Sequence, residues 1–166
     1  MAMMAYMTVT GQKQGKIQGS VTQKGREGSI AVIAYHHSVV SPKDTQTGQP
    51  TGQRLHKPFT VVKATDKATP PLYAALVTNE NLPEVTIEFW KPQIKAGAGV
   101  GAEVQYYTVK LTNAGIASIT AMMPNVEDPT QQNFDMQEEI AFVYQKIEWI
   151  WRDGNITAMD DWEARV

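Results

Sequence analysis

The three histidines are the first residues in this 166-residue chain that could do chemistry, because imidazole can act as a general base or a metal ligand near neutral pH. His36 and His37 are adjacent, so on a strand their side chains face opposite sides and cannot chelate one ion. His56 could meet one of them across neighbouring strands, or work with Asp66 in a small hydrolytic site. The sequence offers neither a firm carboxylate partner for a metal nor a convincing nucleophile for hydrolysis.

Two further patterns are candidates for a site. Adjacent carboxylates occur at Glu138-Glu139 and Asp160-Asp161, but acid–base catalysis needs two carboxyls that face one substrate from separate positions. The glycines of segment 97–101 resemble a phosphate-binding loop, yet a strand pattern follows them where such a loop must open a helix. We interpret these segments as strand ends and a hairpin turn. The sequence therefore predicts no catalytic residue, no metal ligand and no cofactor, and the chain is not expected to be an enzyme.

Tryptophans offer a third kind of chemistry, because an indole ring can stack on a sugar or a base. Trp149 and Trp151 share one face of a predicted strand with Val143 and Ile147, so a place in the core or a subunit interface is the preferred interpretation. A monomeric carbohydrate-binding β-sandwich that uses Trp149, Trp151 or Trp162 stays as the alternative function.

Composition narrows the function classes. The formal net charge of −2 and the pI of about 5.9 argue against a dedicated nucleic-acid binder, which usually carries a basic stripe. The absence of cysteine excludes disulfides, thiolate metal sites and cysteine catalysis. Residues 1–9 lack a basic start and a long apolar run, so we expect neither a Sec signal peptide nor membrane insertion. Export would then require another machine.

The strand that would position these groups lies in residues 54–63. Phe59 and Val61 point to one side and Thr60 and Val62 to the other, with β-branched residues in the majority. Pro58 has no N–H to donate, so it belongs at the start of this strand or on a sheet edge.

Residues 69–79 predict one short helix against the sheets. Thr69 is the expected N-cap, with Asp66 as the alternative, and Pro70 suits the first turn because its missing N–H would have no partner there. The expected core face consists of residues at helical spacing: Leu72, Tyr73, Leu76 and Val77.

Alternating apolar residues predict strands elsewhere in the chain. Residues 104–111 and 116–122 form two strands, separated or bent at 113–115, and the polar tail after residue 154 has no assigned element. Many strands with one helix indicate a single, mainly β domain over residues 1–166, built as two packed sheets or a barrel. The other expected strands are residues 5–10, 30–39, 84–90 and 140–151, the last being the longest.

A long polar loop, residues 41–53, joins two strong strand patterns. It has no apolar residue with which to pack on the domain, and long loops of this kind are often functional. Either a surface excursion or a binding loop fits this composition. The candidate residues are Pro42, Lys43, Asp44, Thr45, Gln46, Thr47, Gly48, Gln49 and Pro50.

Four ordered pieces of sequence carry a family resemblance: Arg54-x-His56-Lys57-Pro58; Lys63-x-x-Asp66-Lys67-Ala68-Thr69-Pro70-x-Leu72-Tyr73-x-Ala75-Leu76; Glu84-Val85-Thr86-Ile87-x-Phe89-Trp90; and Tyr144-Gln145-Lys146-Ile147-x-Trp149. Together they resemble the Hcp family, the haemolysin-coregulated proteins that form the inner tube of the bacterial type VI secretion system. The resemblance extends from residue 6 to about residue 162. Within it, Lys63, Asp66 and Lys67 form a candidate salt-bridge cluster within or between subunits.

The resemblance implies a fold and a set of partners. The fold would be a small β-barrel of two packed, largely antiparallel sheets with one helix on its flank, and residues 41–53 would reach a neighbouring ring. Copies of the chain would form hexameric rings that stack into a hollow tube and hold small effector proteins. The other implied partners are the spike protein and the contractile sheath, with assembly in the bacterial cytoplasm before secretion.

Overall fold

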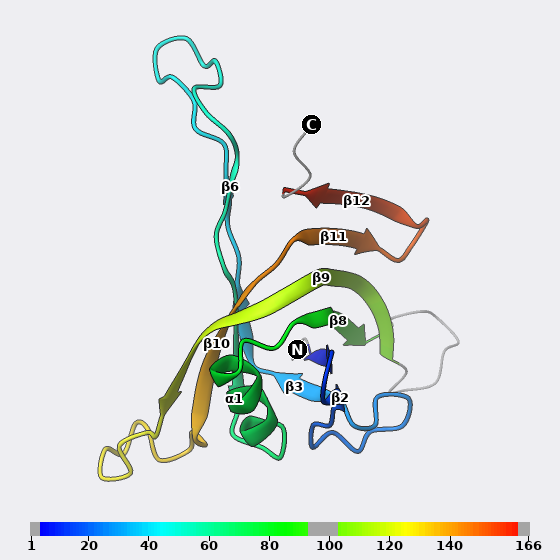
Figure 1. Cartoon of the computed structure of the whole chain (residues 1–166). Coiled ribbons are helices and arrows are strands. Elements are labelled where there is room, and N and C mark those ends of the chain that lie inside the picture. Colours follow the sequence, from blue (N-terminus) through cyan, green and yellow to red (C-terminus); the bar gives the residue numbers. More distant parts are fainter. Residues whose placement is uncertain (1–3, 93–102, 163–166) are drawn as a thin grey trace.

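The computed structural model describes residues 4–92 and 103–162, and in that part of the chain strands dominate (Figure 1). The mainly β prediction with one short helix is confirmed. The elements in chain order are β1 (Met4–Gly11), β2 (Gly15–Ile17), β3 (Ile30–Val32), β4 (Ala34–His36), β5 (Val39–Val40), β6 (Leu55–His56), β7 (Phe59–Ala64), α1 (Thr69–Val77), β8 (Leu82–Pro92), β9 (Glu103–Met122), β10 (Gln137–Val143), β11 (Lys146–Trp151) and β12 (Ile156–Asp161).

The 20-residue strand β9 belongs to two layers at once. Its first half pairs with β8 and β11, and its second half pairs with β10, antiparallel throughout. The predicted break at 113–115 is a bend within one strand, where Asn113 has a φ of 49°. This left-handed conformation is one that asparagine tolerates better than most residues. One layer therefore contains β2, β3, β1, β8, β11 and β12, the other contains β10, β7 and β4, and β9 joins them.

Within residues 4–92 and 103–162 the strands do not close into a barrel, so that part of the expectation is corrected. Residues 30–36 pass from one layer to the other: β3 pairs with β1, and β4 pairs with β7. The strand pattern is interrupted at Ile33, where the chain changes partners. The predicted single strand 30–39 is for this reason three short strands.

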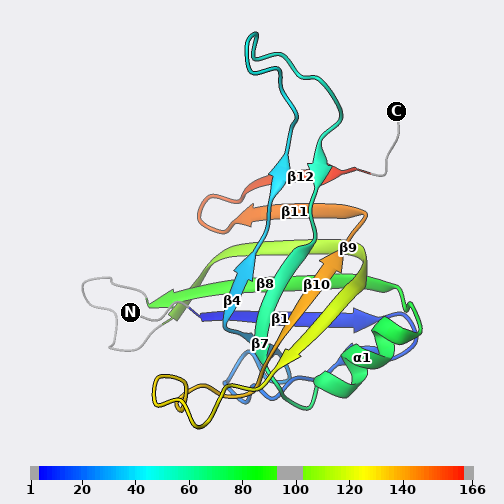
Figure 2. The ribbon, with the colours of Figure 1, turned by 90° about the vertical axis from the view of Figure 1, so that its left-hand side faces the viewer.

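The core lies between the two layers. In β7 the side chains alternate as predicted, with Phe59 and Val61 buried and Thr60 and Val62 half-buried. In the other layer β1 and β8 supply facing side chains such as Met7 and Ile87, while Ile140 of β10 lies beside Val61 in the same layer as β7; all three are fully buried. Helix α1 covers one end of this core beside β9 (Figure 2).

Helix α1 begins and ends differently from the prediction. Its N-cap is Ala68, with no side-chain cap, and Thr69 is already helical. The Thr69 hydroxyl instead accepts the Asp66 N–H at 3.1 Å, so it closes the turn before the helix. The helix stops at Val77 rather than residue 79, because Asn79 adopts a φ of 51°.

The buried face of α1 is rotated from the predicted one. Leu72 is fully buried, and Leu76 and Tyr73 are half-buried. Val77 is 74% exposed, so its assignment to the core is wrong. The small residues Ala68 and Ala75 take its place, since they let the helix approach the sheet closely, and alanine carries little apolar signal in a sequence pattern.

The predicted strand 140–151 is two strands. β10 ends at Val143 and β11 begins at Lys146, because the chain leaves the β10 layer there and joins β9 on its other side. The polar tail without an assigned element contains β12, which pairs with β11 along all six of its residues. The predicted glycine-rich turn at 97–101 lies outside the described residues.

Candidate functional site

A two-stranded projection leaves the domain between β4 and β7 (Figures 1 and 2). We call residues 38–57 the arm; they contain β5, the predicted loop 41–53 and β6. β5 and β6 pair antiparallel at its base, and the Lys57 N–H donates to the Ser38 carbonyl at 3.0 Å. The arm is therefore a continuation of strands β4 and β7 beyond the sheet.

The tip of the arm is an ordered turn. The Thr51 N–H donates to the Pro42 carbonyl at 2.9 Å, and the Asp44 N–H donates to the Gln49 carbonyl at 2.8 Å. The Asp44 carboxylate accepts the N–H groups of the residues two and three positions later, at 2.7 and 3.3 Å. Asp44 thus acts as the local cap that Asp commonly provides in turns, and Gly48 supplies the left-handed residue with a φ of 71°.

Every residue from 39 to 55 is exposed. The arm therefore adds nothing to the core of its own domain, although a loop of this length in a compact domain is unusual without a function. Along its stem it exposes the apolar side chains Val39, Val40 and Leu55. The structure thus places the predicted loop residues together on one projecting element.

A hydrogen-bonded cluster fixes the foot of the arm. The Tyr144 hydroxyl lies 2.7 Å from His56 Nδ1 and 2.7 Å from His37 Nε2. His56 Nε2 lies 2.6 Å from Asp160 in β12. With both imidazoles neutral, all three contacts are satisfied when His56 donates to Asp160, Tyr144 donates to His56, and His37 donates to Tyr144. The prediction that His56 meets another histidine is thereby realised through Tyr144.

The charged end of this cluster is an ion pair. Arg54 Nε donates to Asp160 at 2.5 Å, and the pKa of Asp160 lies below its usual value because of Arg54 first and His56 second. Burial raises the pKa of the Tyr144 phenol, so this hydroxyl stays protonated. Burial likewise lowers the pKa of His37, with His56 and His36 adding to the effect. The cluster thus has an ion pair at its rim and the protonated Tyr144 hydroxyl at its centre.

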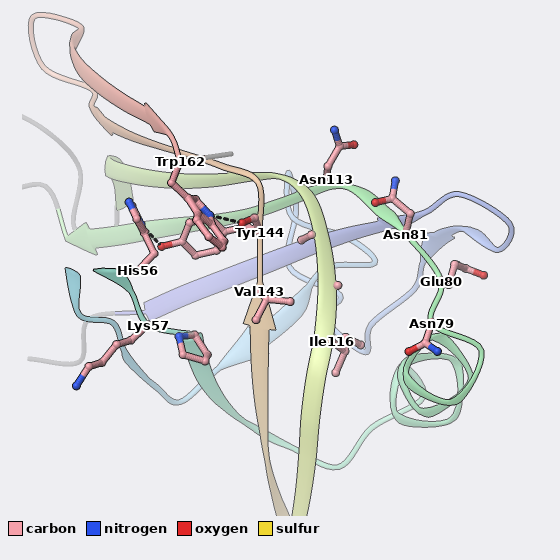
Figure 3. A pocket seen from close by; sticks show the side chains of 13 residues that line it. His56, Lys57, Asn79, Glu80, Asn81, Asn113, Ile116, Val143, Tyr144 and Trp162 are labelled. Atoms are coloured by element: carbon pink, nitrogen blue, oxygen red, sulfur yellow. Dashed lines mark hydrogen bonds between the residues drawn. The ribbon is translucent and has the colours of Figure 1, made fainter. Parts of the chain in front are cut away.

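Trp162 covers this foot beside an open groove (Figure 3). Its ring stacks on His56 at 6.0 Å between centroids, and its Nε1–H donates to the Tyr144 carbonyl at 2.5 Å. The groove has a volume of about 460 Å³ and extends to the C-terminal end of α1, where Glu80 and two asparagines line it. It is open, and its lining contains both polar and apolar residues.

Catalytic and metal chemistry find no support in this arrangement. His56 bonds Tyr144 and Asp160, whereas Asp66 pairs with Lys63, so the proposed hydrolytic partners belong to separate networks. Among residues 4–92 and 103–162, no group of three His, Asp or Glu side chains is placed to hold a metal ion. The same part of the chain contains no helix long and apolar enough to cross a membrane.

The tryptophans do not form one platform. Trp151 and Trp162 lie at opposite ends of the β11–β12 pair, because Trp151 pairs with Ile156 and Lys146 pairs with Asp161, just before Trp162. Six strand residues separate these ends by roughly 17 Å at about 3.3 Å per residue. Trp149 packs against the core instead.

The Lys63, Asp66 and Lys67 cluster is divided. Lys63 is fully buried and pairs within the chain with Asp66, at 3.0 Å, and with Glu138. Lys67 is exposed, and its N–H donates to the Ser20 hydroxyl at 3.4 Å. The intrasubunit alternative therefore describes Lys63 and Asp66, and a contact between subunits stays a prediction for Lys67.

Sequence reasoning missed the partners that β10 and the tail supply. Asp160, Trp162 and Glu138 reach the arm foot or Lys63 from 75 or more residues away along the chain. Only the pairing of β11 with β12 and of β7 with β10 brings them there. A polar tail with one tryptophan gives no local signal of that pairing.

Comparisons with known proteins show which family the chain resembles. The profile of the family described as "Type VI secretion system effector, Hcp" matches residues 6–151. The "Major exported protein" of Pseudomonas aeruginosa is 38% identical over 175 residues, covering 100% of this chain and 99% of that protein.

The fold is also similar to those of solved Hcp structures. One described as the crystal structure of Hcp protein is 31% identical with a TM-score of 0.87, and the match covers 99% of this chain and 100% of that one. Hcp1 from E. coli, at 32% identity, has a TM-score of 0.83 over 97% of this chain and 99% of its own. The profile, the exported relative and the shared fold together show that the chain belongs to the Hcp family of type VI secretion proteins.

Proposed function

We propose that this chain is the repeating subunit of a type VI secretion tube: it forms hexameric rings that stack head to tail through the arm. Hcp is a family of structural secretion-system proteins rather than of enzymes. The single observation that carries the stacking role is the ordered arm, which is exposed over residues 39–55. An ordered element that places none of its residues 39–55 in the core of its own domain is suited to bind another molecule.

Ring closure has a separate structural basis. β12 pairs with β11 on one side, and in the described residues no other strand pairs with it. Both of its faces are largely exposed, including Ile156 and Met159. Strand edges and exposed apolar side chains favour association, and a patch that binds a different patch on the next copy can close a ring. These features support a lateral interface that does not use the arm.

Transport of small effectors in the lumen is the remaining part of the proposal. A net charge of −2 over 166 residues gives no strong field that would trap cargo of one sign. Contacts with the spike protein and the sheath belong to the same proposal, as does passage from the cytoplasm to the exterior. The exported relative supports secretion.

Light scattering and negative-stain microscopy of the purified protein test this function. We expect a hexamer, ring-shaped particles and end-to-end stacks at high protein concentration. A monomer at all concentrations would contradict the tube function. Glycan binding by such a monomer would favour the carbohydrate-binding alternative.

A further inference from the structure

The arm and one loop lie at opposite ends of the same ladder of strands. We call residues 123–136, which join β9 to β10, the far loop. Phe59, where the arm enters β7, pairs with Phe142, whereas Ala64 at the other end of β7 pairs with Gln137, where the far loop ends. Both ribbon views show the arm and the far loop pointing in opposite directions (Figures 1 and 2).

The opposite directions of the arm and the far loop suit copies of the chain that stack head to tail. The exposed stretch 39–55 has about eight residues on each side of its turn, which at roughly 3.3 Å per residue reaches about 25 Å beyond the sheet. A second copy displaced along the direction of β7 would present its far loop to the arm of the first copy. The two elements would meet without either one bending back onto its own domain.

The far loop exposes an unusual amount of apolar surface. Large apolar side chains at its ends and within it are at least half exposed, and large exposed patches often mark interaction sites. Methionine is common on such surfaces because its flexible side chain adapts to a partner. The exposed residues are Met122, Met123, Val126, Phe134 and Met136.

The far loop is nevertheless well organised. The Gln131 N–H donates to the Asp128 carbonyl at 3.0 Å, and the Phe134 N–H donates to the Gln131 carbonyl at 3.1 Å. The Thr65 N–H, just after β7, donates to the Met136 carbonyl at 3.0 Å. The apolar side chains are therefore held outward by an ordered backbone.

Charge favours the arm as the partner of this loop. The far loop contains three acidic residues, Glu127, Asp128 and Asp135, and no lysine or arginine. The arm contains Lys43 and Lys57 besides the paired Arg54, against one acid, Asp44, whose carboxylate caps its own turn. Opposite charges on two surfaces steer their encounter and set their register. Val39, Val40 and Leu55 on the stem offer apolar contacts to the methionines.

We propose that the far loop is the docking surface for the arm of the next copy, with the stem against its apolar side chains and the arm lysines against its acids. This inference rests on the proposed stacking of rings and names the surface that receives the arm. In this proposal, the arm at one end of the paired strands β7 and β10 binds the far loop at the other end of the same two strands in the next copy.

Thiol cross-linking tests this pairing directly, because the chain contains no cysteine of its own. The variant carries Gln46→Cys at the arm tip and Asn133→Cys in the far loop, both at exposed positions. The matched control carries Gln46→Cys with Val77→Cys, which is also an exposed position and lies on α1. Both are treated with a short bismaleimide under conditions in which microscopy shows stacked wild-type rings.

We expect the first variant to give a ladder of covalent species that lengthens with the number of rings in a stack, and the control to give none. Stacks without a ladder would overturn the inference, and so would ladders of equal yield from both variants. A ladder of the same length where microscopy shows only single rings would place the contact between neighbours in one ring and would also overturn it. If the wild type forms no stacks at all, the proposed stacking itself fails, and microscopy identifies that case.

A second variant tests the apolar half of the contact. Met123→Ser combined with Phe134→Ser replaces two exposed side chains, so the fold and the rings should be retained. We expect stacking to require a several-fold higher protein concentration, with Val77→Ser as the matched control that leaves stacking unchanged. Unchanged stacking of the Met123/Phe134 variant would overturn the apolar role of the far loop.

Discussion

The ammonium group of Lys63 on β7 is fully buried against the carboxylate of Glu138, the residue directly opposite it on β10. Asp66 lies 3.0 Å from the same ammonium, and the Thr69 hydroxyl donates to Glu138 at 2.7 Å. This network joins the two strands to the start of α1. This buried network therefore stabilises the fold within one subunit.

Glu138→Ala should therefore lower the free energy of unfolding by about 3–5 kcal/mol, because it leaves the buried Lys63 ammonium without its main partner. Glu139→Ala is the matched control: it changes the adjacent residue, which is exposed, and should cost less than about 0.5 kcal/mol. Urea denaturation of both variants measures the difference. A cost below about 1 kcal/mol for Glu138→Ala would show that the pair does not stabilise the fold.

Leu72→Ala should cost about 2–5 kcal/mol, because Leu72 is fully buried between α1 and the sheet and its removal leaves a cavity. Leu76→Ala should cost less, since Leu76 is half-buried, and Val77→Ala should lie within about 0.5 kcal/mol of the wild type. Chemical denaturation of the three variants ranks them. Equal costs for Leu72 and Val77 would contradict the observed rotation of the helix.

The stability of the protein should fall as the pH drops from 7.5 to 5, in part because of His37. Its folded-state pKa is lowered by burial and by His56 and His36, so the unfolded chain binds a proton more readily than the folded chain. The stability that neutral His37 contributes is therefore fully present above the pKa of histidine in the unfolded chain, about 6.5. It is lost as the pH falls below that value toward the lower pKa of the folded state.

The His37→Gln variant isolates this effect. Its amide can still donate to the Tyr144 hydroxyl, so the fold should be kept while the pH dependence between 7.5 and 5 becomes smaller. His36→Gln changes the exposed neighbour, which is only the last of the three causes of the lowered His37 pKa, so this variant should retain most of the wild-type dependence. Denaturation midpoints at several pH values provide the measurement, and identical pH profiles for wild type and His37→Gln would refute the assignment.

Replacing residues 42–52 with a short glycine-serine turn should change the stability of the domain little, because these residues are exposed and loop-closure entropy varies slowly with length. Rings should persist, while stacks become fewer and secretion falls. Light scattering, microscopy and a secretion assay follow the three effects. If the variant is monomeric, the arm belongs to the lateral interface between subunits of one ring. If stacking and secretion are both unchanged, the arm has no role in assembly.

Local patterns predicted the elements better than their connections. The alternation in β7 and the helical spacing of Leu72 and Leu76 are local, and both were located correctly. The junction at Tyr144 was missed, because an unbroken apolar pattern continues through a point where the chain changes layers. The pairing partners of Lys63 and His56 come from strands β10 and β12, and no local residue pattern specifies which strands become neighbours.

The order of the arm has a thermodynamic consequence for assembly. Fixing the backbone of a flexible residue costs roughly 1–2 kcal/mol, and a disordered segment meets this cost at the moment it binds. In this chain the hydrogen bonds of the tip and the ion pair between Arg54 and Asp160 hold the arm in one conformation before any partner arrives. A docking step can then proceed as the approach of two rigid surfaces, so even a small contact area can give useful affinity.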